Sequence, residues 1–306
     1  MLKWTRLVKL IPRVYACHWS TSLRCVSLFR VKNMSTEDFA FAIDVTNLMD
    51  WGLTTADFEF MLKLEPEGCF VLLDDSEKVG IATTVSFGRV GWFGNLIVRE
   101  DKRKKGGGSL LVSHALKYLK TKNVKTVGLY AYPNAIPFYT RLGFKYDSDF
   151  VVLKGKGVFL TVDADVTAAG KHDLKPVIEL DHNCFGADRR KVLEPILADP
   201  SNLCYVSFEG NRLVGFAMAT IYSETAELGP FVCSQERGDV ATNLVSAAIN
   251  GLKGYEVSLC IGEKEVSVID LLVKSGFGES FRVSRMFFGK PGTKDCIYAA
   301  ESLERG

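Results

Sequence analysis

A strand, a basic loop and a glycine-rich helix start follow one another at residues 95–111. The stretch reads Asn95-Leu96-Ile97-Val98-Arg99-Glu100-Asp101-Lys102-Arg103-Lys104-Lys105-Gly106-Gly107-Gly108-Ser109-Leu110-Leu111. Free main-chain N–H groups at a helix start bind anions, and glycines let a diphosphate come close to the backbone. Consecutive glycines cost roughly 1 kcal/mol each in a helix interior, which indicates that bare backbone is needed here. We therefore interpret residues 103–109 as an anion-binding loop, in preference to a solvated basic turn.

Helical and strand-like patterns alternate on both sides of this loop. Apolar residues at helical spacing predict two helices before it, and short apolar runs bounded by turn residues predict strands. The expected elements are helices over 39–48 and 54–64, strands over 69–73, 79–87 and 92–98, a helix over 107–122, a strand over 124–131, a short helix near 136–142 and a strand near 150–153. Strands that alternate with helices imply a mixed α/β sheet.

An internal repeat divides the chain into two copies of one fold. Four blocks recur in the same order and at nearly the same spacing. Residues 78–83, Gly94, 111–113 and 142–144 are matched by 213–218, Gly229, 244–246 and 275–277. We predict a basic extension over 1–33, a first copy over 34–150, a connecting segment over 151–172 and a second copy over 173–306.

Length and composition are those of an ordinary globular protein. The length of 306 residues is enough for about two domains. The composition, 47% hydrophobic and 24% charged, is the usual globular balance. No apolar stretch approaches the ~18 residues of a membrane span. The net charge of +2 includes the basic residues 1–33, so the rest of the chain is mildly acidic. An acidic body argues against a nucleic-acid binder that would use the basic residues 102–105.

The cysteines and histidines form no familiar metal or disulfide pattern. The eight cysteines never occur as Cys-x-x-Cys, and none of the four histidines is closely paired with another. The sequence therefore predicts no zinc site and no disulfide framework. It favours single buried thiols in a reducing compartment.

Residues 1–33 contain no acidic residue and leave two interpretations open. The segment has the character of an amphipathic organelle-import peptide, if the source is eukaryotic. Alternatively, translation begins at Met34, where Ser35 or Thr36 can cap a helix. Neither interpretation gives the segment a role in the fold. We expect a cytoplasmic protein, or a mitochondrial one if the segment is an import peptide.

Two motifs resemble the GNAT acetyltransferase superfamily. Arg103, Gly106 and Gly108 match its [Gln/Arg]-x-x-Gly-x-[Gly/Ala] signature, which follows a strand. Residues 134–144 are similar to its second block, which ends in Tyr-x-x-x-Gly-Phe, although Pro137 stands where a small residue is usual. Either motif alone would be weak, but together they are specific at their mutual spacing.

The resemblance implies two tandem GNAT-like α/β domains. In each, a mixed, mostly antiparallel sheet has a splayed central strand pair flanked by helices. The resemblance also implies acetyl-CoA as donor and no metal, with the pantetheine lying between the strands at 92–98 and 124–131 like an added strand. The implied contacts are main-chain groups of Leu96, Ile97 and Val98, the diphosphate loop of Arg103, Lys104, Lys105, Gly106, Gly107, Gly108 and Ser109, and the pantetheine wall of Asn134 and Phe138.

The resemblance also implies roles in catalysis. It places Tyr139 beside the departing sulfur, where full proton transfer to a thiolate would be uphill by about 2 kcal/mol. We therefore expect a hydrogen bond to the developing charge, with a core aromatic as the alternative. Many relatives carry a glutamate on the strand before the glycine loop, but residues 92–95 hold no acid. Deprotonation of an amine would then use water ordered by Asn95, or Glu65 or Glu67 in the turn after the second helix.

The second copy lacks the motif residues. Its counterparts of Arg103, Gly106 and Tyr139 are Glu236, Asp239 and Leu272. Acidic residues at a diphosphate position would repel the ligand, so we expect this copy not to bind acetyl-CoA.

The sequence thus predicts an N-acetyltransferase that moves acetyl from acetyl-CoA to a primary amine by direct attack. The acceptor would be a small molecule held between the copies, with no nucleic-acid or membrane partner, and the protein a monomer or homodimer. The alternative is a regulatory module that binds acetyl-CoA without turnover, which the missing base favours.

Overall fold

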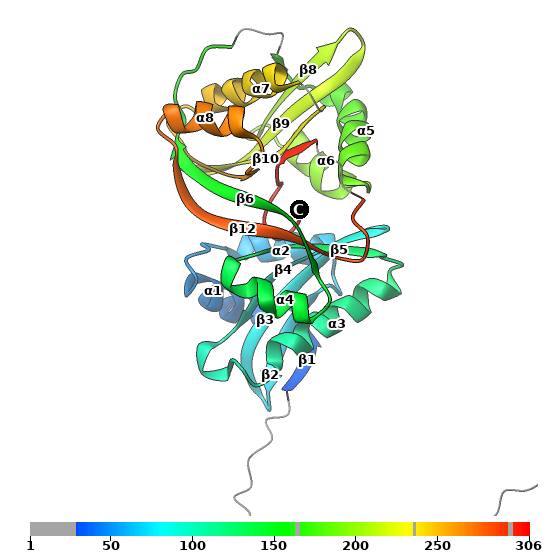
Figure 1. Ribbon diagram of the computed structural model, residues 1–306. Coiled ribbons are helices and arrows are strands. Elements are labelled where there is room, and N and C mark those ends of the chain that lie inside the picture. Colours follow the sequence, from blue (N-terminus) through cyan, green and yellow to red (C-terminus); the bar gives the residue numbers. More distant parts are fainter. Residues whose placement is uncertain (1–28, 163–165, 235–236, 293–295) are drawn as a thin grey trace, which may run out of the picture.

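The computed structural model describes residues 29–162, 166–234, 237–292 and 296–306. They form two lobes, with the first copy below and the second above in Figure 1. Both lobes contain the same succession of two helices, three strands, a long helix, a strand, a short helix and a long last strand. The expected mixed and mostly antiparallel architecture is confirmed.

The first copy begins with an edge strand, β1 (Phe29–Asn33). Its further strands and α-helices are α1 (Phe39–Asn47), α2 (Thr55–Leu64), β2 (Cys69–Asp74), β3 (Glu77–Phe87), β4 (Val90–Val98), α3 (Gly107–Thr121), β5 (Thr126–Ala131), α4 (Ile136–Arg141) and β6 (Lys145–Lys156). Short 3-10 helices are η1 (Thr36–Asp38), η2 (Glu100–Lys102) and η3 (Pro133–Ala135).

The second copy also begins with an edge strand, β7 (Val166–Ala168), followed by the 3-10 helix η4 (Lys171–Asp173). Its repeated elements are α5 (Leu174–Phe185), α6 (Arg190–Ala198), β8 (Leu203–Glu209), β9 (Arg212–Tyr222), β10 (Thr225–Cys233), α7 (Gly238–Gly251), β11 (Glu256–Gly262), α8 (Val266–Lys274) and β12 (Gly278–Phe288). A short strand, β13 (Ile297–Ala299), has no counterpart among the described residues of the first copy.

The two copies exchange their last long strands. Strand β12 pairs antiparallel with β5 of the first copy, and β6 pairs antiparallel with β11 of the second. The two exchanged strands also pair with each other, and they run side by side between the lobes in Figure 1. The described strands therefore form one 13-stranded sheet in the order β1-β2-β3-β4-β5-β12-β6-β11-β13-β10-β9-β8-β7.

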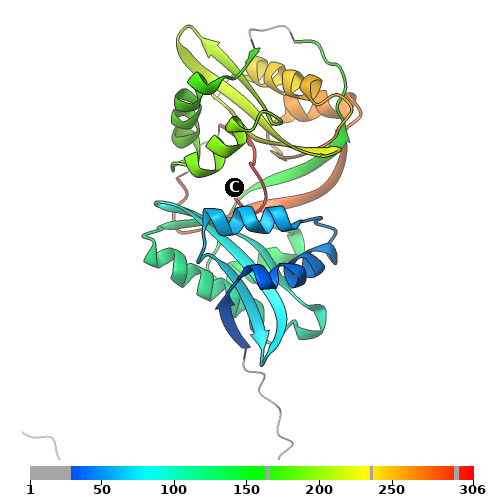
Figure 2. The ribbon, with the colours of Figure 1, turned by 180° about the vertical axis from the view of Figure 1, so that it is seen from behind.

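Helices cover both faces of the sheet in the first copy. Helices α1 and α2, which lie in front of the sheet in Figure 2, bury Phe58 and Met61 against one face together with Ile97 of β4. On the other face, α3 and α4 pack against Val98, the next residue of β4. Consecutive side chains of a strand point to opposite faces, so β4 is buried on both sides at the centre of this lobe.

Three expectations need correction. Residues 29–33 form β1 and pair with β2, so the end of the extension 1–33 does have a role in the fold. The expected connecting segment 151–172 begins inside β6, which continues to Lys156 because it pairs along its length with β11. Cys184 and Cys296 form a disulfide, whereas Cys69, Cys204, Cys233 and Cys260 are free and buried.

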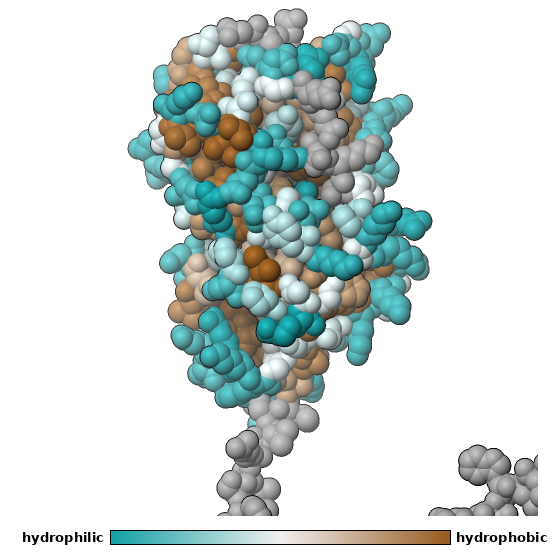
Figure 3. All heavy atoms as spheres, viewed as in Figure 1, coloured by the Kyte–Doolittle hydropathy of each residue, from teal (hydrophilic) through white to brown (hydrophobic). Residues whose placement is uncertain are grey.

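Other sequence expectations concern the surface and the chain termini. Among the described residues, no helix has the length and apolar character needed to cross a bilayer. The face in Figure 3 mixes hydrophilic side chains with separate hydrophobic patches.

Ser35 caps η1, with reciprocal hydrogen bonds to Asp38. Cys17 and Cys25 lie outside the described residues.

Candidate functional site

Strands β4 and β5 pair over only part of their length. Parallel pairs join 90–92 to 126–128, and the described strands show no further pair beyond them. At Asn95 the φ angle is +49° and the register of β4 against β3 shifts. The Asn95 amide donates to Oγ1 of Thr83 at 3.2 Å, which holds this bulge in place. The β5-facing edge of β4 therefore leaves main-chain groups of residues 96–98 without a neighbouring strand.

The glycine loop brings bare backbone to the end of this edge. Gly106 has a φ of +94°, a left-handed conformation, and caps α3. A Cβ at Gly107 would lie 2.6 Å from Cδ2 of Leu72, and one at Gly108 would lie 3.4 Å from the ring of Phe138. The first N–H groups of α3 have no intrahelical acceptor, so they are available to an anion.

The basic residues of the loop are exposed, and one of them ties the loop to β4. Nε of Arg103 donates to the carbonyl of Val98 at 2.8 Å. Nζ of Lys105 donates to the carbonyl of Asp101 at 3.1 Å. Lys104 adopts a positive φ of 61°. Residues 103–105 are exposed, whereas Ser109 is half-buried at the helix start.

Tyr139 lies inside a cluster of aromatic rings at the wall of a cavity. It is 7% exposed, and its ring centroid is 5.0 Å from that of Phe138, 5.7 Å from Phe144 and 6.4 Å from Phe93. Burial raises the pKa of its hydroxyl well above the ordinary value, so the hydroxyl keeps its proton and can donate a hydrogen bond. Asn134, the other predicted wall residue beside half-buried Phe138, is exposed.

The cavity lies between the two copies and has a volume of about 500 Å³. The first copy contributes residues 93–96 of β4, the ends of β5 and α4, and the segment before α2. The second contributes parts of β10, β11 and β12. Four acidic residues lie in its lining, Asp50, Asp57, Glu227 and Glu304, together with aromatic side chains that include Trp51, Tyr130, Tyr132 and Phe281. The described residues contain no group of His, Cys, Asp and Glu side chains suited to a metal ion.

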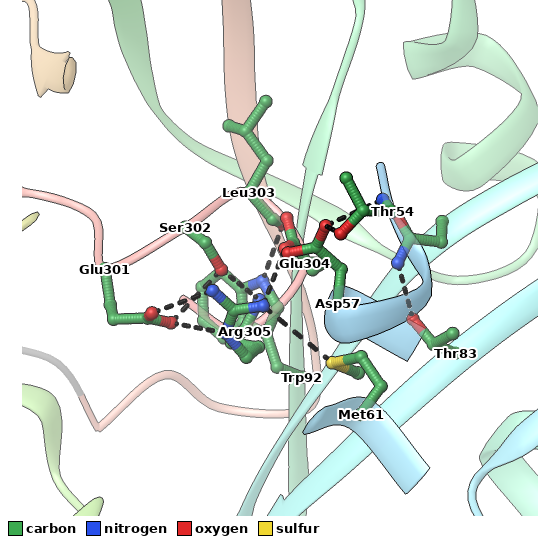
Figure 4. Close-up of polar contacts among 11 residues, drawn as sticks. Thr54, Asp57, Met61, Thr83, Trp92, Glu301, Ser302, Leu303, Glu304 and Arg305 are labelled. Carbon is green, nitrogen blue, oxygen red and sulfur yellow. Dashed lines mark hydrogen bonds and ion pairs between the residues drawn. The ribbon is translucent and has the colours of Figure 1, made fainter. Parts of the chain in front are cut away.

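Glu304 belongs to the segment 300–306, which follows β13 and is anchored by buried polar contacts. Nε1 of Trp92 donates to the carbonyl of Leu303 at 3.2 Å. Arg305 binds both carboxylate oxygens of Glu301, at 2.8 and 2.9 Å, and its Nη1 donates to Glu304 at 2.8 Å. Figure 4 shows Arg305 between these two glutamates.

The far end of the same segment is held by the second copy. Arg189 donates to the main-chain oxygen of Gly306. Its guanidinium also binds both oxygens of Asp181, at 3.0 and 2.6 Å, and both side chains are at most 1% exposed. The segment is thus fixed at several points along the interface between the copies.

The two glutamates of the cavity influence each other. Desolvation, followed by the nearby carboxylate of Glu304, raises the pKa of Glu227 against the opposing charge of Arg305. Desolvation likewise raises the pKa of Glu304, although Arg305 opposes it. Like charges in a water-poor site hinder each other's ionisation, so the pair holds a proton more readily than an exposed glutamate does.

The acids predicted from the sequence lie elsewhere. Glu65 accepts hydrogen bonds from the Tyr118 hydroxyl at 2.5 Å and the Ser86 amide at 2.9 Å, and it pairs with Lys191 at 3.1 Å. Burial opposes ionisation of Glu65, but these contacts outweigh it and lower its pKa. Glu67 is exposed and 3.4 Å from Lys122. Neither acid lines the cavity, so the structure gives no support to Glu67 or Glu65 as the base.

The sequence did not predict Glu227 and Glu304 as site residues, because both belong to the second copy rather than to the copy that carries the motifs. The one sequence signal is the repeated glycine pair, since Gly94 and Gly229 each make room for the segment 300–306.

In the second copy, the short strand β13 fills the gap between the central strands β10 and β11. Strands β10 and β11 pair in parallel only over 225–227 and 256–258, and β13 then pairs antiparallel with both. The amide of Phe277 donates to the carbonyl of Leu272 at 3.0 Å, as that of Phe144 does to Tyr139 at 3.1 Å, so Leu272 holds the tyrosine position. Asp239 is paired with Arg237 at 3.1 Å, and Glu236 lies outside the described residues.

Comparisons with known proteins agree with this geometry. Residues 34–144 match a family model described as "Acetyltransferase (GNAT) family", and residues 177–299 match one described as "Acetyltransferase (GNAT) domain". The chain is 25% identical to Holothin acyltransferase of a Pseudoalteromonas species over 287 residues, 90% of this chain and 94% of that protein. It is 22% identical to the uncharacterized N-acetyltransferase YitH of Bacillus subtilis over 229 residues, 72% of this chain and 78% of that one.

Solved structures share the fold. One from Pyrococcus horikoshii has a TM-score of 0.76 at 19% identity and covers 95% of this chain and 100% of its own. A tandem GNAT protein from the clavulanic acid biosynthesis pathway has a TM-score of 0.60 at 14% identity, with 85% and 98% covered. The two family-model matches, which follow one another along the chain, show that it belongs to the GNAT acetyltransferase family and carries two GNAT domains in tandem.

Proposed function

We propose that the first copy transfers an acetyl group from acetyl-CoA to a primary amine by direct attack. One observation carries this proposal: the unpaired edge of β4 joins the cavity, which Leu96 and Tyr139 line, to the glycine loop, where a Cβ at Gly108 would lie 3.9 Å from Val98. Family membership supports acyl transfer in general. The donor and the acceptor class are the proposed part.

The described main chain fits acetyl-CoA as the donor. The N–H groups of residues 107–109 precede the first intrahelical hydrogen bond, from Leu110 to Gly106, so they can bind a diphosphate. A Cβ at Gly108 would approach the Phe138 ring, whereas a Cβ at Gly107 would meet Leu72 in the core. Arg103, Lys104 and Lys105 add positive charge around it. Leu96, Ile97 and Val98 would hydrogen-bond the pantetheine through their main-chain groups, as an added strand. Phe138 and Asn134 would flank it.

Catalysis then requires stabilisation of the departing sulfur and a neutral amine. When bound, acetyl-CoA supplies the thioester. The Tyr139 hydroxyl, which its buried environment keeps protonated, donates a hydrogen bond to the negative charge that develops on sulfur. Asn95 would orient water or the amine at the bulge of β4, since its side chain lines the cavity and is held by Thr83.

Thiol release over a panel of primary amines, with acetyl-CoA as donor, tests the proposal. Tyr139→Phe should lower kcat by about 10²-fold, the usual cost of losing one preorganised donor. The matched control is Tyr146→Phe, because Tyr146 is 55% exposed on β6 and away from the cavity. If acetyl-CoA binds by calorimetry but no amine releases CoA above hydrolysis, the regulatory alternative is correct and the proposal fails.

A further inference from the structure

Two carboxylates of the second copy line the cavity between the copies. We propose that Glu227 and Glu304 form the ammonium end of the acceptor site, and that Glu227 receives the proton of the incoming amine. This inference rests on the proposed function and specifies its acceptor. The acceptor is a primary amine, cationic in solution, on a compact apolar body.

Glu304 is delivered to the part of β4 that lacks an acid of its own. An ideal Cβ at Gly94 would lie 2.5 Å from Cα of Glu304, so the main chain of the segment 300–306 lies directly against β4 there. The next residue, Asn95, and the side chain of Glu304 line the same cavity. Glu304 is 14% exposed and is held by Arg305 at 2.8 Å, which fixes its position.

Glu227 approaches the cavity from β10. It is paired with Thr220 of β9 and Ser258 of β11, which sets its place in the sheet. Among the described residues, the Glu227 carboxylate forms no ion pair and accepts no hydrogen bond, in contrast to Glu304. A partly buried carboxylate without a partner is the group in this cavity best suited to take a proton from a bound ammonium.

The charges around Glu227 leave a negative excess. Besides burial, four nearby charged groups shift the pKa of Glu227: Asp57 of α2, and Glu301, Glu304 and Arg305 of the segment 300–306. Besides burial, the charge of Glu227 in turn raises the pKa of Tyr222 on β9 and of Cys260 on β11. Asp50 and the exposed Lys154 of β6 complete the charged lining of the cavity. Arg305 already binds Glu301 and Glu304, so its charge is shared. A cationic acceptor would balance the remaining carboxylates, and the raised pKa of Glu227 suits it to accept a proton near neutral pH.

An aromatic wall completes the acceptor site. Nε1 of Trp51 donates to the Tyr132 hydroxyl at 3.1 Å, and the rings of Tyr132 and Phe281 lie 5.4 Å apart. All three residues line the cavity together with the carboxylates. Rings of this kind give apolar contact area, which fits an aromatic or branched aliphatic body beside the ammonium group.

The proton balance of the transfer follows from these positions. The ammonium gives one proton to Glu227, which frees the lone pair of the nitrogen. The nitrogen then forms a bond to the acetyl carbon as the carbon–sulfur bond breaks. The nitrogen then loses a second proton, which ends on the sulfur. Until that proton arrives, the Tyr139 hydroxyl stabilises the negative charge on the sulfur by a hydrogen bond. Glu227 finally releases its proton to solvent, so one proton leaves per amide formed.

Binding without turnover tests the ammonium end. Calorimetry on the full chain saturated with CoA would compare phenethylamine with 2-phenylethanol, its neutral counterpart. We expect the amine to bind at least about tenfold more tightly, a modest gain for a desolvated charge pair. Glu227→Gln and Glu304→Gln should each reduce this preference. Glu224→Gln, in the exposed turn before β10, should keep it, and unchanged CoA affinity would show that each variant is folded.

Turnover with the most active amine of the panel tests the proton step. Glu227→Gln should lower kcat by about 10²- to 10⁴-fold. The loss should shrink for an acceptor amine that is already neutral at the assay pH. Glu304→Gln should raise KM more than it lowers kcat, since its role is to hold the ammonium.

The outcomes separate this inference from the proposed function. Equal binding of amine and alcohol overturns the ammonium end, even if the protein releases CoA. A Glu227→Gln variant with wild-type kcat overturns the proton-acceptor role. A clear amine preference without any CoA release supports the ammonium end and refutes the proposed acetyl transfer.

Discussion

Gly94 and Glu304 touch through their main chains, although they are far apart in the sequence. A Cβ at Gly94 would come within 2.5 Å of Cα of Glu304. The repeat-related Gly229 meets the same segment at the carbonyl of Ala300. The matched glycines thus have a common cause, because the segment 300–306 crosses the central strand of each copy and joins them at the cavity.

A methyl group at Gly94 should displace this segment. We expect Gly94→Ala to lower the free energy of unfolding by about 1–3 kcal/mol, as overpacking of a fixed contact does. It should also weaken amine binding, because Glu304 would move. Urea denaturation measures the first effect. Gly278→Ala is the control, since a Cβ at Gly278 meets no atom within 4 Å; equal stability of the two variants would contradict the close contact.

An acid in the glycine loop should abolish donor binding. In Gly106→Asp, a side chain must adopt the left-handed φ of +94°, and a negative charge would face the diphosphate. We expect calorimetry to detect no acetyl-CoA binding. Gly210→Asp imposes the same change at a φ of +60° in a turn of the second copy, with no atom within 4 Å of its Cβ. Loss of binding in both variants would mean that the effect is not local to the loop.

The elements of the first copy were readable from its sequence because local chemistry dictates them. Consecutive apolar residues such as Ile97 and Val98 point to opposite faces of a sheet, and here they pack into separate cores. Such a pair therefore identifies a central strand that is buried on both faces. The glycines at 106–108 locate a helix start for the same local reason. The expected helix over 107–122 and the structure's Gly107–Thr121 accordingly differ by one residue at the end.

The strand exchange and the acids of the cavity could not be read in this way. Strands β6 and β12 are the equivalent last strands of the two copies, so their patterns alone do not show which sheet each joins. Glu227 and Glu304 look like ordinary surface residues in the sequence. They become a pair only after β10, β13 and the segment 300–306 are packed against the first copy, which depends on long-range tertiary contacts.

Loss of the Arg189 guanidinium should destabilise the protein strongly. Asp181 would remain buried at 0% side-chain exposure without its partner, and the main-chain oxygen of Gly306 would lose a donor. We expect Arg189→Ala to cost about 3–5 kcal/mol of unfolding free energy, as removal of one member of a buried pair does. Lys175→Ala, in the exposed pair with Glu179, should cost about 0–1 kcal/mol. Similar denaturation midpoints for the two variants would contradict the buried clamp.

Asp38 should make stability depend on pH in the acid range. Burial opposes its ionisation, but Lys32 and Lys78, both at 2.6 Å, and the Ser35 amide at 2.9 Å outweigh burial and lower its pKa from 3.8 to about 2. Because the folded pKa is below the unfolded one, the stabilisation of about 2 kcal/mol is present above pH 3.8 and is lost as the pH falls through 2.

The advantage of wild type over Asp38→Asn should follow this window. Urea titrations at a series of pH values should show a destabilisation by Asp38→Asn that is constant near neutral pH and shrinks below a pH of about 4. Asp44→Asn, at an exposed position of α1, is the control and should show no such trend. Since Lys32 lies on β1, a pH-independent difference would mean that this ion pair does not hold the edge strand to η1.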